Sequence, residues 1–154
     1  LILPRPAPPA PRIAQVSATG RGSGDHGVAL QHPGHRTHDA VLAFLRDAEI
    51  LAARPAFDAK HWQNGVPPGF RLAYRPSLAY RMALIAQGRF DAMLTIRPSW
   101  HWDIAAGALI ATEAGALATA ADGSPLTFNT ETPQSPGVLA ANPGLHRAIR
   151  DRLV

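Results

Sequence analysis

The sequence predicts an α/β (α+β) fold, with a mixed sheet flanked by helices, on three observations. Segments with helical apolar spacing alternate along the second half with short apolar runs typical of buried strands. Gly and Pro mark most boundaries between these segments. The chain has 154 residues, 46% of them hydrophobic, which is enough to fill the core of one domain.

The composition excludes several classes of protein. Without cysteine the chain has no disulfides and no cysteine-based metal site. The net charge is +4, but the basic residues, of which only Lys60 is a lysine, are scattered and form no stripe with aromatic residues. No apolar run approaches the roughly 20 residues of a membrane span, and no segment resembles a signal peptide. We therefore expect a cytoplasmic protein that binds neither nucleic acid nor membranes.

The chain divides into two parts at about residue 36. Residues 1–36 are rich in Pro, Gly and His, a composition that predicts loop or disorder apart from a short strand at 12–17. Residues 37–154 carry the periodic segments and form the predicted domain. Because the sequence starts with Leu1 rather than Met, we expect an upstream piece to be missing.

The predicted domain starts with a helix and a strand. Thr37 is a suitable N-cap, and the apolar residues that follow predict an amphipathic helix ending near Arg54-Pro55. Residues 62–69 are a turn-rich connection. Residues 70–75 are a short strand that Pro76 ends.

The remaining elements are more regular. Ser77 can cap a helix that runs to Gln87, where Gly88 ends it. The later segments predict, in order, a strand at 90–96, a helix from Asp103, a hairpin at 117–128, a strand at 137–140 and a helix from Asn142 or Pro143 to Arg152.

The run Trp-Asp-Ile-Ala-Ala-Gly-Ala-Leu-Ile-Ala-Thr-Glu-Ala-Gly at 102–115 is the most informative motif. It places one carboxylate, Asp103, at the mouth of a helix of small residues that can pack closely against its neighbours. From spacing alone, Asp103 is either an N-cap or a functional carboxylate.

This run resembles the second signature of the inositol monophosphatase family of Mg²⁺-dependent phosphate monoesterases. The residues that fit the signature are Trp102, Asp103, Ala105, Ala106, Gly107, Leu109, Ile110, Gly115 and Ala116. The order of elements from Pro76 to the end also looks like the C-terminal domain of that family. The resemblance implies the C-terminal layers of an α/β/α/β/α sandwich.

The resemblance also implies roles for several residues. Asp103 would be a ligand to a catalytic Mg²⁺ ion, for which a carboxylate oxygen is a suitable donor. Trp102 would bury its ring beside the site. Ser77 stands where relatives hold the substrate's sugar or ring hydroxyls, although a helix cap explains it equally well.

The family's other signature, Asp-Pro-Ile/Leu-Asp-Gly-Thr/Ser, is absent from this sequence. It supplies further metal-binding carboxylates, and a single carboxylate cannot hold the metals that activate water. The resemblance therefore implies a C-terminal part that is incomplete as a catalyst and pairs with an N-terminal half or a second copy. The alternative is a non-catalytic remnant or interaction module.

The expected substrate is a phosphorylated small molecule, either an inositol phosphate or a nucleotide bisphosphate. Inositol-hydrolysing relatives carry a Glu at about the position of Ile96 or Arg97, and neither residue is acidic. This difference leaves room for a 3'(2'),5'-bisphosphate nucleotidase, in which Arg97 could meet a second phosphate through its bidentate fork. Arg97 could equally be exposed to solvent at the end of the predicted strand, with no role in substrate binding.

Overall fold

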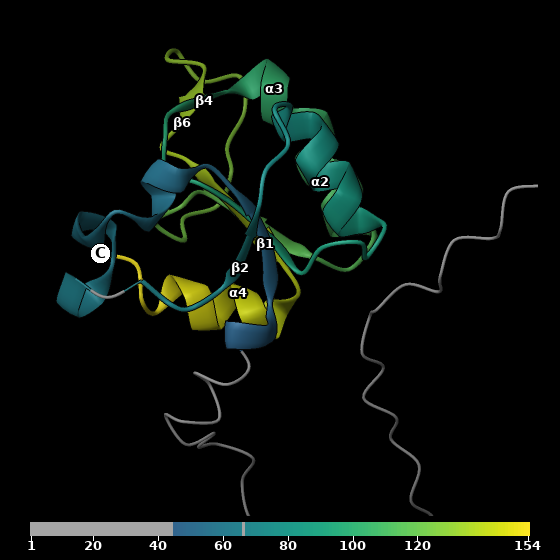
Figure 1. Ribbon diagram of the computed structural model, residues 1–154. Helices are drawn as coiled ribbons and strands as arrows, with labels where there is room; N and C mark the ends of the chain where they lie inside the picture. Colours follow the sequence, from purple (N-terminus) through teal and green to yellow (C-terminus); the bar gives the residue numbers. More distant parts are fainter. Residues whose placement is uncertain (1–44, 66) are drawn as a thin grey trace, which may run out of the picture.

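The computed structural model describes residues 45–65 and 67–154 (Figure 1). The predicted strand at 12–17, the predicted boundary at residue 36 and the start of the first predicted helix lie outside these residues. The strands are β1 (Glu49–Ala52), β2 (Arg71–Ala73), β3 (Ala92–Thr95), β4 (Ser99–Trp100), β5 (Leu117–Thr119), β6 (Gln134–Ser135) and β7 (Val138–Ala141). The helices are α2 (Leu78–Ala86), α3 (His101–Glu113), α4 (Pro143–Arg150) and three 3₁₀ turns, η1 (Arg54–Phe57), η2 (Ala59–His61) and η3 (Gln63–Gly65).

The main sheet is mixed, as predicted, and has five strands in the order β2-β1-β3-β7-β5. Strand β1 pairs in parallel with both β2 and β3. Strand β7 is antiparallel to β3 and to β5, so β5 runs in the same direction as β3. Four strands therefore point one way, and only β7 runs against them.

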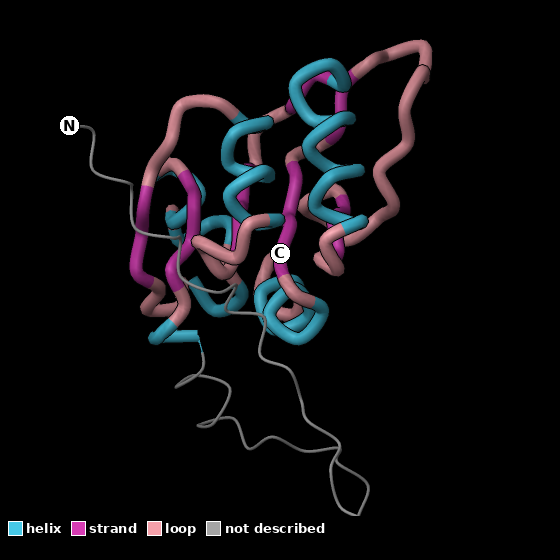
Figure 2. The backbone as a smooth tube through the Cα atoms, turned by 90° about the vertical axis from the view of Figure 1, so that its right-hand side faces the viewer, coloured by secondary structure: helices cyan, strands magenta, loops and turns pink. Residues whose placement is uncertain are grey.

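Helices cover both faces of this sheet. Side chains alternate along each strand, so Ile50 and Leu94 enter one core cluster while Leu51 and Met93 enter the other. The first cluster includes residues of α4, and the second includes residues of α2 and α3. Figures 1 and 2 show α2 and α3 side by side on one side of the sheet and α4 on the other.

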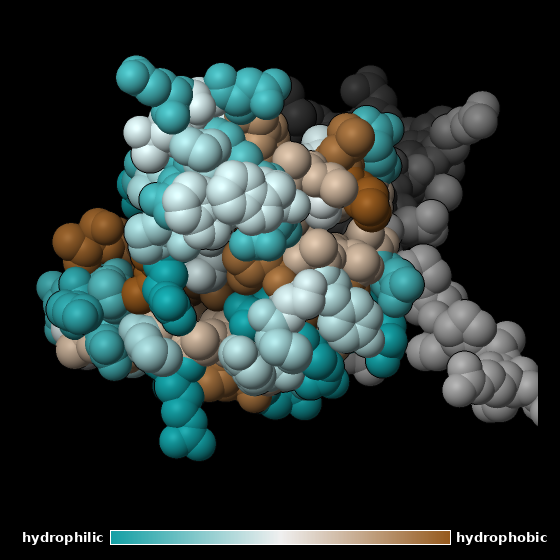
Figure 3. All heavy atoms as spheres, turned by 90° about the horizontal axis from the view of Figure 1, so that it is seen from above, coloured by the Kyte–Doolittle hydropathy of each residue, from teal (hydrophilic) through white to brown (hydrophobic). Residues whose placement is uncertain are grey.

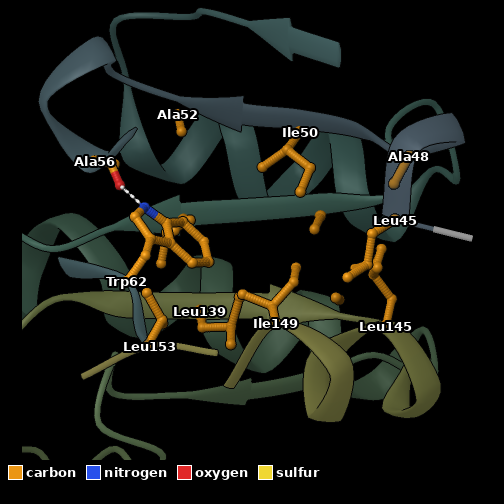
Figure 4. Close-up of a cluster of buried hydrophobic side chains, with 13 residues drawn as sticks. Leu45, Ala48, Ile50, Ala52, Ala56, Trp62, Leu139, Leu145, Ile149 and Leu153 are labelled. Atoms are coloured by element: carbon orange, nitrogen blue, oxygen red, sulfur yellow. Dashed lines mark hydrogen bonds between the residues drawn. The ribbon is translucent and has the colours of Figure 1, made fainter. Parts of the chain in front are cut away.

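The face under α4 is closed by aliphatic side chains and one indole (Figure 4). Leu145 and Ile149 of α4 are buried against Leu139 of β7. Trp62 closes one end of the cluster and donates from Nε1 to the carbonyl of Ala56 over 2.9 Å. This bond satisfies the only polar atom that the indole brings into the core.

Small residues let α2 and α3 pack closely on the opposite face. A Cβ atom on Gly107 would lie 2.9 Å from the Cβ of Met82, closer than real Cβ atoms approach. The glycine of the motif therefore permits the contact between the two helices.

Two predicted elements were wrong. The helix expected to reach Arg54-Pro55 ends by Asp47, and β1 takes the apolar run that follows. A short apolar run fits either structure, and pairing with strands on both sides decides for the strand.

The predicted hairpin at 117–128 is also wrong in its second half. Leu117–Thr119 is strand β5, but its partner is β7, and residues 126–128 form no strand. Only an isolated bridge joins Thr119 to Pro125, whose ring nitrogen has no hydrogen to donate to a ladder. In addition, the two-stranded sheet of β4 and β6 was not predicted.

The other expected elements are confirmed at Arg71–Ala73, Leu78–Ala86, Ala92–Thr95, Val138–Ala141 and Pro143–Arg150. Among the described residues, none of the helices has the length and apolar character needed to cross a membrane.

Candidate active site

The topology gathers the three predicted site residues at one edge of the main sheet. Strands β2 and β3 run in the same direction, and α2 and α3 begin after their carboxyl ends. Ser77 precedes α2, Arg97 follows β3, and Asp103 lies in the first turn of α3. Ligand sites of open α/β sheets form at such an edge, where strands end and helices begin.

Asp103 is not the N-cap of α3. The cap residue is Trp100, which makes no side-chain cap hydrogen bond, and Asp103 is the third residue of the helix. Its side chain is exposed. The N-cap interpretation was therefore wrong, and the carboxylate lies where the partial positive charge of the helix start favours an anion.

The described residues do not complete a metal site around Asp103. They contain no group of three or more His, Asp or Glu side chains placed to hold a metal ion. Mg²⁺ prefers six oxygen ligands in octahedral geometry, several of them waters. Asp103 is a suitable residue to be one of these ligands.

Two tryptophans stack on each other at the start of α3. The ring centroids of Trp100 and Trp102 are 4.6 Å apart, and the planes are inclined by 10°. Trp100 is 41% exposed and Trp102 is 68% exposed. The expectation that Trp102 buries its ring is therefore wrong for the described residues.

His101, between these tryptophans, points into the protein. It is 7% exposed, and its ring meets that of Phe128 edge-on at 5.3 Å. Its Nδ1 atom is buried without a hydrogen-bond partner among the described residues. Along the chain, the rings of Trp100, His101 and Trp102 are exposed, buried and exposed in turn. Strand β4 ends at Trp100 and helix α3 begins at His101, so the direction of the side chains changes here.

Ser77 caps α2, as predicted. Its Oγ accepts a hydrogen bond of 3.2 Å from the backbone nitrogen of Tyr80. The side chain is exposed, and the hydroxyl hydrogen is not used in this bond. The cap geometry leaves Ser77 able to donate to a ligand.

Arg97 lies just beyond the carboxyl end of β3, and its side chain is exposed. Ser99 holds the local backbone by donating from Oγ to the carbonyl of Arg97 over 3.1 Å. Arg97 therefore lies in the segment between β3 and β4 that leads to α3, the helix that carries Asp103.

A buried cation near the start of α2 was not expected from the sequence. Arg81 is only 4% exposed, and its Nε donates to the carbonyl of Arg75. Its guanidinium lies 4.8 Å from the ring centroid of Tyr74, and burial lowers the pKa of Arg81. An Arg among apolar helix positions gives no local signal of burial, because long side chains usually reach solvent.

Comparison with known proteins agrees with this architecture. The sequence model of the inositol monophosphatase family matches residues 10–153. An inositol-1-monophosphatase of Bacillus subtilis is 40% identical over 73 residues, which are 47% of this chain and 26% of that protein.

Solved structures share the fold. The crystal structure of inositol monophosphatase II from Staphylococcus aureus matches with a TM-score of 0.58 and 24% identity, over 70% of this chain and 41% of that one. The extragenic suppressor protein suhB from Bartonella henselae matches with a TM-score of 0.52 and 24% identity, over 69% and 43% of the two chains.

This chain thus spans less than half the length of the relatives it matches. The family match nevertheless covers most of the sequence, including every element of the described fold. The chain belongs to the inositol monophosphatase family.

Proposed function

We propose that this chain forms the C-terminal layers of a Mg²⁺-dependent phosphate monoesterase. The observation that carries the proposal is the exposed carboxylate of Asp103 in the first turn of α3, at the edge where β2 and β3 end. Asp103 supplies one hard oxygen ligand. The remaining protein ligands come from polypeptide outside the described residues, in the same protein or in a partner chain.

The other two side chains at this edge hold the substrate. With Asp103 as one of its ligands, Mg²⁺ would supply the polarisation of the phosphate ester and the activation of a water molecule. Ser77 donates its free hydroxyl hydrogen to a substrate oxygen while it caps α2. Arg97 attracts and orients an anionic group of the substrate through its planar donors.

We propose a phosphorylated small molecule as the substrate. Crystal structures of the staphylococcal relative are described as bound to inositol monophosphate and to 2'AMP. The exposed guanidinium of Arg97 favours, as a second candidate, a 3'(2'),5'-bisphosphate nucleotidase, because a second phosphate gives this cation a partner.

A complementation assay tests the proposal. The chain is assayed for phosphate release from inositol 1-phosphate and from 3'-phosphoadenosine 5'-phosphate, with and without an N-terminal polypeptide that carries the Asp-Pro-x-Asp-Gly-Thr/Ser signature. We expect release only when both parts and Mg²⁺ are present. We also expect Asp103→Asn to remove most of it, because an amide is a weaker ligand for Mg²⁺ than a carboxylate.

Glu113→Gln is the matched control, since Glu113 is an exposed carboxylate at the opposite end of the same helix. It should leave the complemented activity unchanged. Equal activity of wild type and Asp103→Asn would refute the metal role. Failure of the complemented pair to hydrolyse either ester would instead favour the non-catalytic interaction module.

A further inference from the structure

Arg81 is a buried cation in the first turns of α2, the helix that Ser77 caps. It is the fourth residue of this helix and is 4% exposed. Side chains of a helix lean towards its N-terminus, so the Arg81 side chain reaches back to the loop that joins β2 to α2. There its guanidinium lies 4.8 Å from the ring centroid of Tyr74, and its Nε donates to the carbonyl of Arg75.

Arg81 is bonded to the chain on both sides of Pro76. Its side chain donates to the carbonyl of Arg75, and its backbone nitrogen donates to the carbonyl of Ser77 over 3.0 Å. Proline has a fixed φ and confines the residue before it to extended conformations. The chain between the two bonds therefore has little freedom, and the bonds together set the direction in which Ser77 enters the helix.

A buried arginine is a costly residue at this position. Burial lowers the pKa of Arg81, because the charged guanidinium is less favourable here than in water. The partners that the described residues give it are a carbonyl and an aromatic ring. An apolar side chain would fill the same space without this cost, but it could not donate to the carbonyl of Arg75. The arginine therefore adds a bond that holds the loop.

This loop lies at the edge where the proposed function places the substrate. Figure 1 shows α2 beginning at the top of the molecule, and Figure 3 looks down on this end, where hydrophilic and pale residues make up much of the surface. Ser77 is exposed, and its Oγ accepts from the backbone nitrogen of Tyr80 over 3.2 Å. Its hydroxyl hydrogen is free for a ligand, and the loop determines where this group lies.

We propose that Arg81 is a positioning residue that fixes the loop before Ser77 and so aims the Ser77 hydroxyl at the substrate. This inference rests on the proposed function, which gives Ser77 its role at the substrate. Arg81 acts through Ser77, since its own guanidinium is buried against the loop.

Hydrogen exchange in the purified chain tests the positioning apart from catalysis. The amide of Tyr80 is bound to Ser77 Oγ, so its exchange rate, measured by NMR, reports whether Ser77 keeps its place. We expect Arg81→Met to speed this exchange about threefold or more, because a mobile loop breaks the cap more often. The amide of Gln87, which binds the carbonyl of Ala83 at the far end of α2, should keep its rate.

Kinetics of the complemented pair test the effect on the substrate. For the ester that the pair hydrolyses, Arg81→Met should raise KM about five- to tenfold with little change in kcat, the effect of one weakened hydrogen bond. In a Ser77→Ala background Arg81→Met should have no further effect, because the group that it positions is gone. Arg81→Lys keeps the charge and a donor, so it should restore part of the affinity.

Two controls separate positioning from stability and charge. Ile85→Ala removes a buried side chain from the same helix, so it should lower the free energy of unfolding but leave KM unchanged. Arg89→Met removes an exposed positive charge beyond the end of α2 and should change neither the exchange of Tyr80 nor KM.

An unchanged exchange rate of Tyr80 in folded Arg81→Met would overturn the inference. Equal effects of Arg81→Met on KM in the wild-type and Ser77→Ala backgrounds would also overturn it. Circular dichroism checks folding, and if Arg81→Met does not fold, the smaller shifts expected for Arg81→Lys decide in its place.

The two proposals fail in distinguishable ways. Faster exchange of Tyr80 in Arg81→Met, without any hydrolysis by the complemented pair, removes the phosphatase and leaves Arg81 as the residue that positions Ser77. Hydrolysis by the complemented pair, with the exchange of Tyr80 and KM unchanged in Arg81→Met, removes the positioning role and leaves the phosphatase.

Discussion

The two helical faces of the sheet differ in how completely they are covered. Helix α4 buries Leu145 and Ile149 and exposes Arg147, the pattern of a helix with protein on one side and water on the other. Helix α3 buries Ile104 and Ala111 against the core, yet it also exposes apolar side chains. A helix that is apolar all round belongs inside a larger structure. The contrast agrees with a chain that spans less than half the length of its relatives.

The largest expected change in stability comes from replacing a buried isoleucine on α4, compared with an exposed isoleucine on α3. Ile149 on α4 is 0% exposed and Ile110 on α3 is 51% exposed. We expect Ile149→Ala to lower the free energy of unfolding by about 2–5 kcal/mol, because it leaves a cavity. Ile110→Ala should change it by about 0.5 kcal/mol or less. Urea denaturation measures both, and a large loss for Ile110→Ala would mean that α3 is covered in solution.

The second largest expected change in stability comes from disturbing the contact between α2 and α3. In Gly107→Ala the new methyl group would lie 2.9 Å from the Cβ of Met82, so the helices must separate. The strain of roughly 1–3 kcal/mol is partly offset by about 1 kcal/mol of better helix propensity.

We therefore expect a modest net loss of stability, measured as a lower midpoint of thermal unfolding. Ala106→Gly, at an exposed neighbouring position, is the control for propensity alone. If Gly107→Ala proves more stable than the wild type, the close packing of α2 on α3 is not a constraint.

The smallest expected effect is a dependence of the free energy of unfolding on pH, caused by a buried histidine of α4. His146 is buried, and its Nε2 lies 2.8 Å from Oγ1 of Thr119. The hydroxyl of Thr119 donates to the carbonyl of Ala120, so neutral His146 donates from Nε2 to Thr119. Burial, aided by the positive charge of Arg150, lowers the pKa of His146 below its ordinary value of 6.5.

The unfolded chain therefore takes up this proton first as the pH falls. The stability that neutral His146 contributes is present above pH 6.5 and is lost as the pH falls from there towards the folded pKa. Denaturation curves between pH 8 and pH 5 should show this loss, and His146→Gln should reduce it. An unchanged pH slope in His146→Gln would assign the dependence to other groups.

Local signals in the sequence predicted much of the fold. Ser77 is predicted as a helix cap because a capping side chain acts within its own turn, and its Oγ accepts the expected backbone hydrogen bond. The last helix is predicted to begin at Asn142 or Pro143, and the structure shows that Asn142 is its N-cap. Strand β1 was mistaken for helix because its identity depends on neighbours that are distant in sequence. Strands β4 and β6 are too short to show any periodicity.

The site roles of Asp103, Ser77 and Arg97 remain predictions, and the structure shows only where each residue lies. The motif at 102–115 placed Asp103 at a helix start, and the strand order gathers Ser77 and Arg97 at the same edge. The exposure of Trp102 could not be predicted, because it depends on which layers of the family fold the described residues include. The burial of Arg81 depends on a fold around α2 that no local pattern encodes.

The position of β7 has a consequence for synthesis on the ribosome. This strand inserts between β3 and β5, both of which leave the ribosome earlier. Until residues 138–141 emerge, each of those strands presents an unpaired edge that can join a neighbouring nascent chain. Gly137 directly precedes β7 and has a φ of +85°. A side chain at this position would collide with the backbone carbonyl of Thr95. A chain released before Gly137 is added lacks β7, and we therefore expect it to be prone to aggregation.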